Sequence, residues 1–146
     1  MIAARVGRLP GIVVASDDAV FPVLCEHLFG RSELVTHLAS VTLDGLLEAA
    51  RRQEPDVILL DIDGLEQDKT RQLAAKLALV SDARLVIASG YLGPGSPELN
   101  RLLQNIEAIP MLKPSGSGSL SLAGTDGDAF LASLESVFED LREDDR

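Results

Sequence analysis

Cysteine, aromatic residues and basic residues are all scarce in this sequence. The single cysteine, Cys25, excludes an internal disulfide and a zinc site built from several cysteines, and it fits a reducing compartment. The chain has few aromatic rings that could stack on the bases of single-stranded nucleic acid: it contains no tryptophan, one tyrosine and four phenylalanines. A formal net charge of −10 repels phosphate backbones. We therefore expect no nucleic-acid partner.

Long hydrophobic runs are also missing. The longest apolar run is far shorter than a membrane span, and the short run before Asp17 and Asp18 lacks the cleavage site of a signal peptide. We therefore expect a cytoplasmic chain without a membrane partner. The 146 residues, 46% of them hydrophobic, suit one domain over 1–146, with its core at about 10–142.

What the sequence does contain is a strict alternation of short apolar runs with amphipathic stretches. The predicted strands cover 11–15, 34–41, 56–61, 84–89 and 108–112, and the predicted helices cover 19–29, 43–53, 66–80, 97–105 and 129–142. A Ser/Gly-rich segment, 115–127, reads as a flexible loop. This alternation predicts an α/β protein of flavodoxin-like type, a (βα)5 three-layer sandwich with parallel strands in the order 2-1-3-4-5.

Polar residues end or directly follow four of the five predicted strands. Because the carboxyl ends of parallel strands meet at one edge of a sheet, we expect these side chains to converge there. They are carboxylates, a hydroxyl and an amine: Asp17, Asp18, Asp61, Asp63, Ser89 and Lys113.

This combination of groups suits phosphoryl transfer. Three neighbouring carboxylates repel one another, and a hard cation such as Mg²⁺ removes that repulsion. The carboxylate of Asp61 can then attack phosphorus, while Ser89 and Lys113 neutralise the oxygens of the transferred group. The residues therefore predict Mg²⁺-dependent phosphoryl transfer to Asp61.

The motifs, taken in order along nearly the whole chain, resemble the receiver domain of two-component response regulators. They are an Asp-Asp pair, an aspartate that ends a Pro-Asp-Val-Ile-Leu-Leu-Asp strand, a serine that ends the next strand, and a Lys-Pro pair. The segment 113–117, Lys-Pro-Ser-Gly-Ser, is similar to the receiver part of the chemotaxis protein-glutamate methylesterase.

The resemblance implies a role for each residue at this edge. Asp61 would be the phosphoacceptor, and Ser89 and Lys113 would contact the phosphoryl oxygens. Mg²⁺ would be bound directly by Asp18, through water or as a second ligand by Asp17, and also by Asp61. The backbone carbonyl of Asp63 would complete the metal site.

The resemblance also implies partners rather than an enzyme with a separate substrate. The phosphoryl donor would be a histidine kinase, and phosphorylation would change binding to a downstream protein or promote a homodimer. The helix at 97–105, the fifth strand and the last helix would form the partner face. Only self-catalysed phosphorylation and dephosphorylation are expected.

The chain departs from the family in two places. Asp61-Ile62-Asp63-Gly64 leads almost directly into a helix where the family has a longer loop, and Pro110 replaces the aromatic residue expected three positions before Lys113. Because proline cannot change rotamer as an aromatic ring does, Tyr91 is the remaining aromatic candidate for a switch. These departures favour an alternative, a pseudo-receiver that binds proteins without being phosphorylated.

A third hypothesis is a phosphatase. Asp61-Ile62-Asp63-Gly64 resembles the nucleophile motif of haloacid-dehalogenase-type phosphatases, which also use a serine or threonine, a lysine and acidic metal ligands. In those enzymes the acidic pair comes last in the chain, whereas Asp17 and Asp18 come first here. The order of the motifs therefore favours a receiver.

Overall fold

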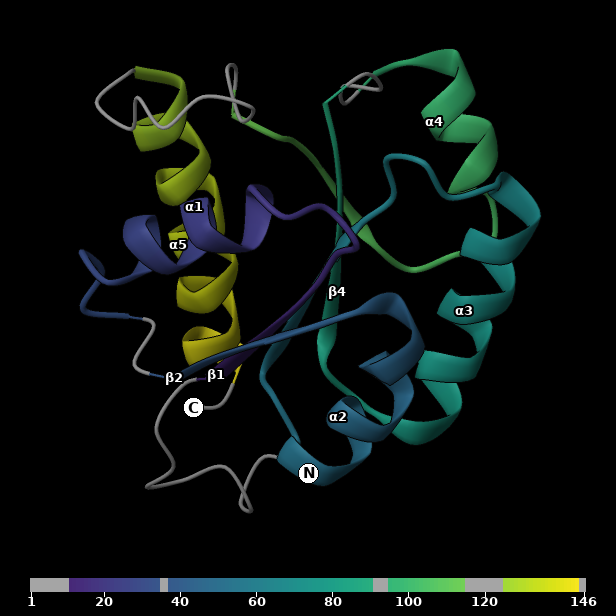
Figure 1. Ribbon diagram of the computed structural model, residues 1–146, viewed down its shortest axis with the longest axis horizontal. Helices are drawn as coiled ribbons and strands as arrows, with labels where there is room; N and C mark the ends of the chain where they lie inside the picture. Colours follow the sequence, from purple (N-terminus) through teal and green to yellow (C-terminus); the bar gives the residue numbers. More distant parts are fainter. Residues whose placement is uncertain (1–10, 35–36, 91–94, 115–124, 145–146) are drawn as a thin grey trace.

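A five-stranded parallel sheet with helices on both faces forms the molecule (Figure 1). The computed structural model describes residues 11–34, 37–90, 95–114 and 125–144. The strand order is β2-β1-β3-β4-β5, which confirms the predicted flavodoxin-like topology. The strands are β1 (Gly11–Ala15), β2 (His37–Val41), β3 (Val57–Asp61), β4 (Arg84–Ser89) and β5 (Ile109–Leu112).

Helices follow each of the five strands, and two of them start where the sequence supplies a proline or a capping serine. Pro22 lies in the first turn of the first helix, and Ser96 accepts a hydrogen bond from the Leu99 N–H at the start of the fourth. The helices are α1 (Phe21–Phe29), the 3₁₀ turn η2 (Leu43–Gly45), α2 (Leu46–Gln53), α3 (Gln67–Val80), α4 (Pro97–Leu102) and α5 (Thr125–Asp144).

Several boundaries shift by one or two residues, and the larger differences from the predicted boundaries are at β2, α4 and α5. Strand β2 starts at His37 rather than 34, helix α4 ends at Leu102 rather than 105, and helix α5 begins at Thr125 rather than 129. The last three residues of the predicted Ser/Gly-rich loop are therefore helical, and its residues 115–124 lie outside the described part of the chain.

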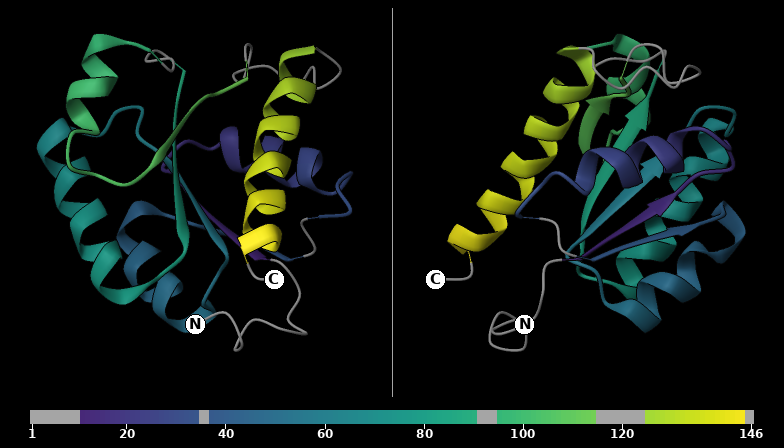
Figure 2. Two further views of the ribbon diagram at one scale, coloured as in Figure 1. Left: turned by 180° about the vertical axis from the view of Figure 1, so that it is seen from behind. Right: turned by 60° about the vertical axis from the view of Figure 1, so that its left-hand side comes forward.

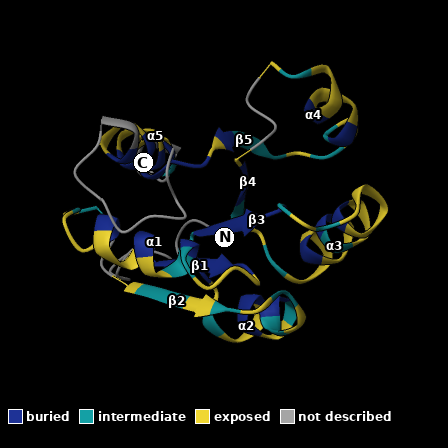
Figure 3. Ribbon diagram, turned by 45° about the horizontal axis from the view of Figure 1, so that its top comes forward, coloured by how far each residue is buried: buried dark blue, intermediate teal, exposed yellow. Residues whose placement is uncertain are grey.

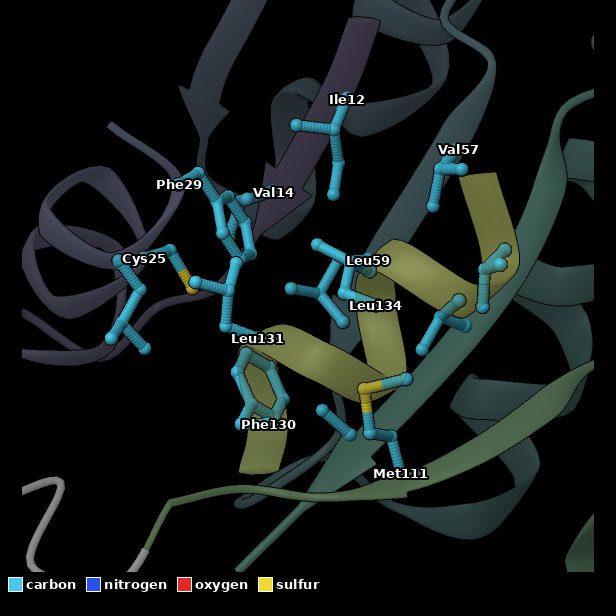
Figure 4. Packing of buried hydrophobic residues seen from close by; sticks show 14 of the residues in the cluster. Ile12, Val14, Cys25, Phe29, Val57, Leu59, Met111, Phe130, Leu131 and Leu134 are labelled. Atoms are coloured by element: carbon cyan, nitrogen blue, oxygen red, sulfur yellow. The ribbon is translucent and has the colours of Figure 1, made fainter. Parts of the chain in front are cut away.

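The two faces of the sheet are covered by different helices and carry different side chains. Helices α1 and α5 cover one face, and α2, α3 and α4 cover the other (Figures 2 and 3). The first face holds all the aromatic contacts found in the described residues: Phe130 lies 6.0 Å from Phe21 and 6.3 Å from Phe29, measured between ring centroids. Figure 4 shows Phe29 and Phe130 among the residues of this cluster. The second cluster is built from aliphatic residues alone.

Burial increases from the edge of the sheet to its centre. Every residue of β3 is buried, whereas β2 at the edge has none that is fully buried. The continuous apolar run of β3 therefore places Asp61, its last residue, at the carboxyl end of a strand that is covered on both faces. No helix in the described ranges is long and apolar enough to cross a membrane.

Candidate functional site

The carboxyl edge of the sheet brings together side chains from four strands. Ser16 directly follows β1, Asp61 ends β3, Ser89 ends β4, and Lys113 directly follows β5. The Lys113 N–H donates to the Ser89 carbonyl at 2.9 Å, which extends the pairing of β5 with β4 by one residue. This extension holds the lysine side chain at the same edge as Asp61 and Asp63.

Asp61 is buried, with 3% of its surface exposed, and both of its carboxylate oxygens accept hydrogen bonds. Its Oδ2 accepts from Ser16 Oγ at 2.8 Å and from Lys113 Nζ at 3.1 Å. Its Oδ1 accepts from the Asp63 N–H at 3.0 Å. A buried carboxylate needs such partners, and these three donors fix its orientation.

Lys113 is the cation at the centre of this edge. Its ammonium lies 3.0 Å from Asp63, 3.1 Å from Asp61 and 3.9 Å from Asp18, and its side chain is only 5% exposed. It also lies 4.7 Å from the centroid of the buried Phe21 ring. Burial alone lowers the pKa of Lys113, but the Asp63 hydrogen bond and the Asp61 charge outweigh it, so the pKa is raised.

Asp63 joins the site through its side chain. Its Oδ1 accepts from Ser89 Oγ at 2.7 Å, and its Oδ2 accepts from the Gly90 N–H at 2.9 Å and from Lys113 Nζ at 3.0 Å. Burial by itself raises the pKa of Asp63, whereas these hydrogen bonds lower it, and the net result is a lowered pKa. The group is therefore a carboxylate at neutral pH.

Asp17 and Asp18 have backbone donors instead. The carboxylate of Asp18 accepts from the Val20 N–H at 3.2 Å and from the Phe21 N–H at 3.3 Å, so it caps the first turn of α1. The Asp17 Oδ1 accepts from the Leu43 N–H at 3.1 Å, at the start of η2.

The oxygen atoms at this edge are of the type that binds magnesium, but they are not arranged around a metal site. Aspartate oxygens are ligands that Mg²⁺ prefers, and Asp18 and Asp61 both approach one point, which the Lys113 ammonium takes. Among the residues that the structure describes, no group of three or more His, Cys, Asp or Glu side chains is placed to hold a metal ion. Binding of Mg²⁺ therefore requires the carboxylates to rearrange around it.

The structure brings together Asp18, Asp61, Asp63 and Lys113, with Ser89 joined through Asp63. Reasoning from the sequence missed two contacts. One is the hydrogen bond from the Ser16 hydroxyl to Asp61, and the other is the set of hydrogen bonds that the Asp63 side chain accepts. The role of the Asp63 backbone carbonyl in binding a metal stays a prediction.

The structure describes one of the two positions considered for an aromatic switch, Pro110, but not the other, Tyr91. Pro110 lies within β5, half-buried and in register with Ile87, so it belongs to the ladder of the sheet. Tyr91 lies outside the described residues, as does the segment after Pro114 that resembles the methylesterase receiver.

Receiver domains of response regulators are among the solved structures to which the chain is similar. The chain is similar to the response regulator domain of Thermotoga maritima CheB, with 21% identity, a TM-score of 0.68, and 92% of this chain and 98% of the other covered. It is also similar to a CheY-like receiver domain protein from Methanospirillum hungatei JF-1, with 19% identity, a TM-score of 0.63, and coverage of 93% and 98%.

A third similar structure is a complex of the P1 domain of CheA3 with CheY6 from R. sphaeroides. The likeness has 18% identity, a TM-score of 0.65, and coverage of 91% of this chain and 99% of the other. No protein-family model and no curated protein matches the chain. At these identities, the likenesses show a shared fold.

Proposed function

We propose that this chain is a receiver module of a two-component system that accepts a phosphoryl group on Asp61. The observation that carries the proposal is the buried Asp61 carboxylate, held between Ser16 Oγ and Lys113 Nζ at the carboxyl edge of a receiver-type sheet. A purely structural role explains it poorly, because burying a charge that has no function is costly.

The residues of the edge fit the chemistry of such a transfer. An Asp61 oxygen attacks the phosphorus of a phosphohistidine, the P–N bond breaks with its electron pair going to the imidazole, and an acyl phosphate forms on Asp61. Ser16 and Lys113 fix the attacking carboxylate, and Lys113 and Ser89 then bind oxygens of the transferred group. Mg²⁺, held by Asp18 and Asp61 with Asp17 as a further ligand, would neutralise charge on those oxygens.

The proposed phosphoryl donor is a histidine kinase. Support comes from the fold that the chain shares with CheY6. The solved structure of CheY6 is a complex with the P1 domain of CheA3. The net charge of −10 and the scarcity of aromatic residues both disfavour nucleic acid as the target of the signal.

Acetyl phosphate, a small phosphoryl donor, tests the proposal without the kinase. We expect intact-mass spectrometry to detect one added phosphoryl group after incubation with acetyl phosphate and MgCl₂, and none in Asp61→Asn. The matched control is Asp68→Asn, which removes the same charge from the exposed first turn of α3 and should leave phosphorylation intact. Phosphorylation of Asp61→Asn equal to that of the wild type would contradict the assignment.

A second candidate is the pseudo-receiver, a protein-docking module that is not phosphorylated. The observation that favours it is that Ser89 and Lys113 both donate hydrogen bonds to the Asp63 carboxylate, so neither is directed at a phosphoryl group on Asp61. The same experiment separates the two functions, because a pseudo-receiver gains no phosphoryl group even with Asp61 intact and the donor in excess. The phosphatase hypothesis has no comparable support. Phosphatases of that type usually start with the strand that carries the nucleophile, whereas Asp61 ends the third strand of this chain.

The proposed partner surface lies between β5 and α5. A groove of about 530 Å³ runs between them, next to Lys113, and Leu112 on its rim is 49% exposed. An exposed leucine beside a groove suits a downstream protein or a second copy of the chain. We expect Leu112→Asp to abolish partner binding, or concentration-dependent dimerisation in analytical ultracentrifugation, while leaving the acetyl phosphate reaction unchanged.

A further inference from the structure

The carboxylate of Asp63 has three donors that come from distant parts of the chain. Ser89 and Gly90 lie at the end of β4, and Lys113 follows β5, yet all three donate to Asp63 within 2.7–3.0 Å. The Asp63 side chain is only 18% exposed. A surface aspartate in a turn is normally solvated, so this one has exchanged water for a complete set of protein donors.

These three donors form an anion cradle, by which we mean Ser89 Oγ, Gly90 N–H and Lys113 Nζ together. A hydroxyl, a backbone amide and an ammonium that converge on one point are the groups that bind the oxygens of a phosphoryl group. The Asp63 carboxylate presents two oxygens to this cradle and satisfies every member of it.

The turn after β3 holds Asp63 in this position. Ile62 is buried, and its N–H donates to the Ala88 carbonyl at 3.0 Å, so the chain stays paired with β4 beyond Asp61. Gly64 then reverses direction with a φ of +84°, a conformation that favours glycine. Between these two fixed residues, Asp63 lies beside Gly90 closely enough that a Cβ at position 90 would come within 3.3 Å of its Oδ2.

We propose that the Asp63 carboxylate is an internal anion that occupies the cradle and competes with an incoming phosphoryl group for Ser89, Gly90 and Lys113. This inference rests on the proposed function, because it concerns the same edge. The Ser89 hydroxyl and the Gly90 amide each donate one hydrogen, and Asp63 accepts both, so a phosphoryl group on Asp61 must displace Asp63 to use them. The unphosphorylated chain therefore holds Ser89 and Lys113 in contact with an anion already.

The first test measures the rate of phosphorylation. Asp63→Asn keeps the shape of the side chain and removes its charge, and Asp63→Ala removes the competing oxygens altogether. We expect the initial rate with acetyl phosphate and MgCl₂ to rise about tenfold in both variants, the factor equivalent to one hydrogen bond to a charged group. Asp68→Asn is the control for charge alone and should react like the wild type. Rates in both Asp63 variants at or below the wild-type rate would overturn the proposal.

The second test does not depend on phosphorylation. Inorganic phosphate is titrated, at constant MgCl₂, into ¹⁵N-labelled wild type and Asp63→Ala, and the Gly90 amide resonance is followed by NMR. We expect phosphate to shift this resonance to saturation in the variant and to leave it in place in the wild type. If Asp63→Ala does not fold, Asp63→Asn takes its place.

The two tests fail in different ways. A phosphate-dependent shift only in the Asp63 variant, with no phosphorylation of any protein, would contradict the proposed function and support the occupied cradle. A Gly90 shift of equal size in both proteins, or in neither, would overturn the occupied cradle while leaving the phosphorylation of Asp61 to be judged by mass spectrometry.

Discussion

The acidic pair after β1 and the acidic pair at the end of β3 lie at the same edge of the sheet but have different hydrogen-bond donors. Asp17 and Asp18 accept mainly from backbone N–H groups of the segments that follow β1 and β2. Asp61 and Asp63 accept from side chains of other strands, and both bind the buried ammonium of Lys113.

The difference in donors shows that aspartates at the same edge can have different structural roles. The first pair stabilises local turns and remains partly exposed, so its oxygens can exchange a backbone donor for a metal ion at small cost. The second pair is part of a network that connects β1, β3, β4 and β5, so changes there should affect both the stability of the fold and its reactivity.

The largest expected effect comes from removing the cation that the second pair shares. Lys113→Met keeps most of the apolar stem over Phe21 but leaves the buried Asp61 beside Asp63 without a counter-charge. We expect a loss of about 3 kcal/mol in the free energy of unfolding, measured by urea denaturation. Lys69→Met, on the exposed side of α3, is the control and should change stability by no more than about 0.5 kcal/mol. Equal losses in the two variants would show that Lys113 is not the centre of the network.

A smaller loss should follow when Asp61 loses its neutral donor. Ser16→Ala removes a 2.8 Å hydrogen bond to a buried carboxylate, and we expect about 2 kcal/mol of destabilisation in urea. Ser40→Ala, at an exposed position of β2, serves as the control. If both serine variants unfold at the same urea concentration, the Ser16 hydroxyl does not hold Asp61 in solution.

In the first pair, capping and metal binding can be separated at Asp18. Asp18→Ala removes the cap of α1 and should cost about 1 kcal/mol, whereas Asp18→Asn retains an acceptor and should cost less. Both variants should react more slowly with acetyl phosphate and MgCl₂, because each lacks the negatively charged carboxylate that is predicted to bind the metal. Wild-type rates in Asp18→Asn would remove Asp18 from the metal site and leave it as a cap.

The pH dependence of stability should report on the second pair. The folded pKa of Asp63 is lowered, so its contribution is present above its unfolded pKa and is lost as the pH falls through the folded value. The folded pKa of Lys113 is raised, so its contribution is present below its unfolded pKa and is lost as the pH rises through the folded value. We expect the difference in unfolding free energy between wild type and Asp63→Asn to be constant from roughly pH 5 to 9 and to shrink below about pH 4. A difference that persists unchanged at the acid end would exclude this ion pair.

The smallest effect is expected at Asp17. Asp17→Ala removes one hydrogen bond to an exposed backbone N–H, and the free energy of unfolding should fall by no more than about 0.5 kcal/mol. Asp44→Ala, in the 3₁₀ turn that Asp17 contacts, is the matched control. A loss as large as that of Asp18→Ala would show that the two members of the first pair are equivalent.

The sequence was sufficient to predict the sheet order and the positions of Asp61, Ser89 and Lys113. Apolar runs of strand length identify the strands, and the carboxyl ends of parallel strands must share one edge. The side-chain partners were not predictable in the same way. Ser16 looks like any residue after a strand, and the orientation of Asp63 depends on Ile62 being paired with β4 and on the positive φ of Gly64.

The end of α4 shows the same limit for secondary structure. The apolar periodicity of the sequence continues to Ile106, yet the helix ends at Leu102. Arg71, from α3, donates to the carbonyls of Arg101 and Leu102, and Asn105 adopts a φ of +66°. A helix end that is capped from another helix depends on tertiary contacts, which a local pattern does not contain.

A crystal structure of the protein with MgCl₂ and beryllofluoride, an analogue of the phosphoryl group, tests the assignment of this edge most directly. We expect beryllofluoride on a carboxylate oxygen of Asp61, with Ser89 Oγ and Lys113 Nζ on its fluorines and the Asp63 side chain turned away from them. Asp61 without beryllofluoride, with Asp63 still between Ser89 and Lys113 at saturating reagent, would contradict the account and leave a docking module that is not phosphorylated.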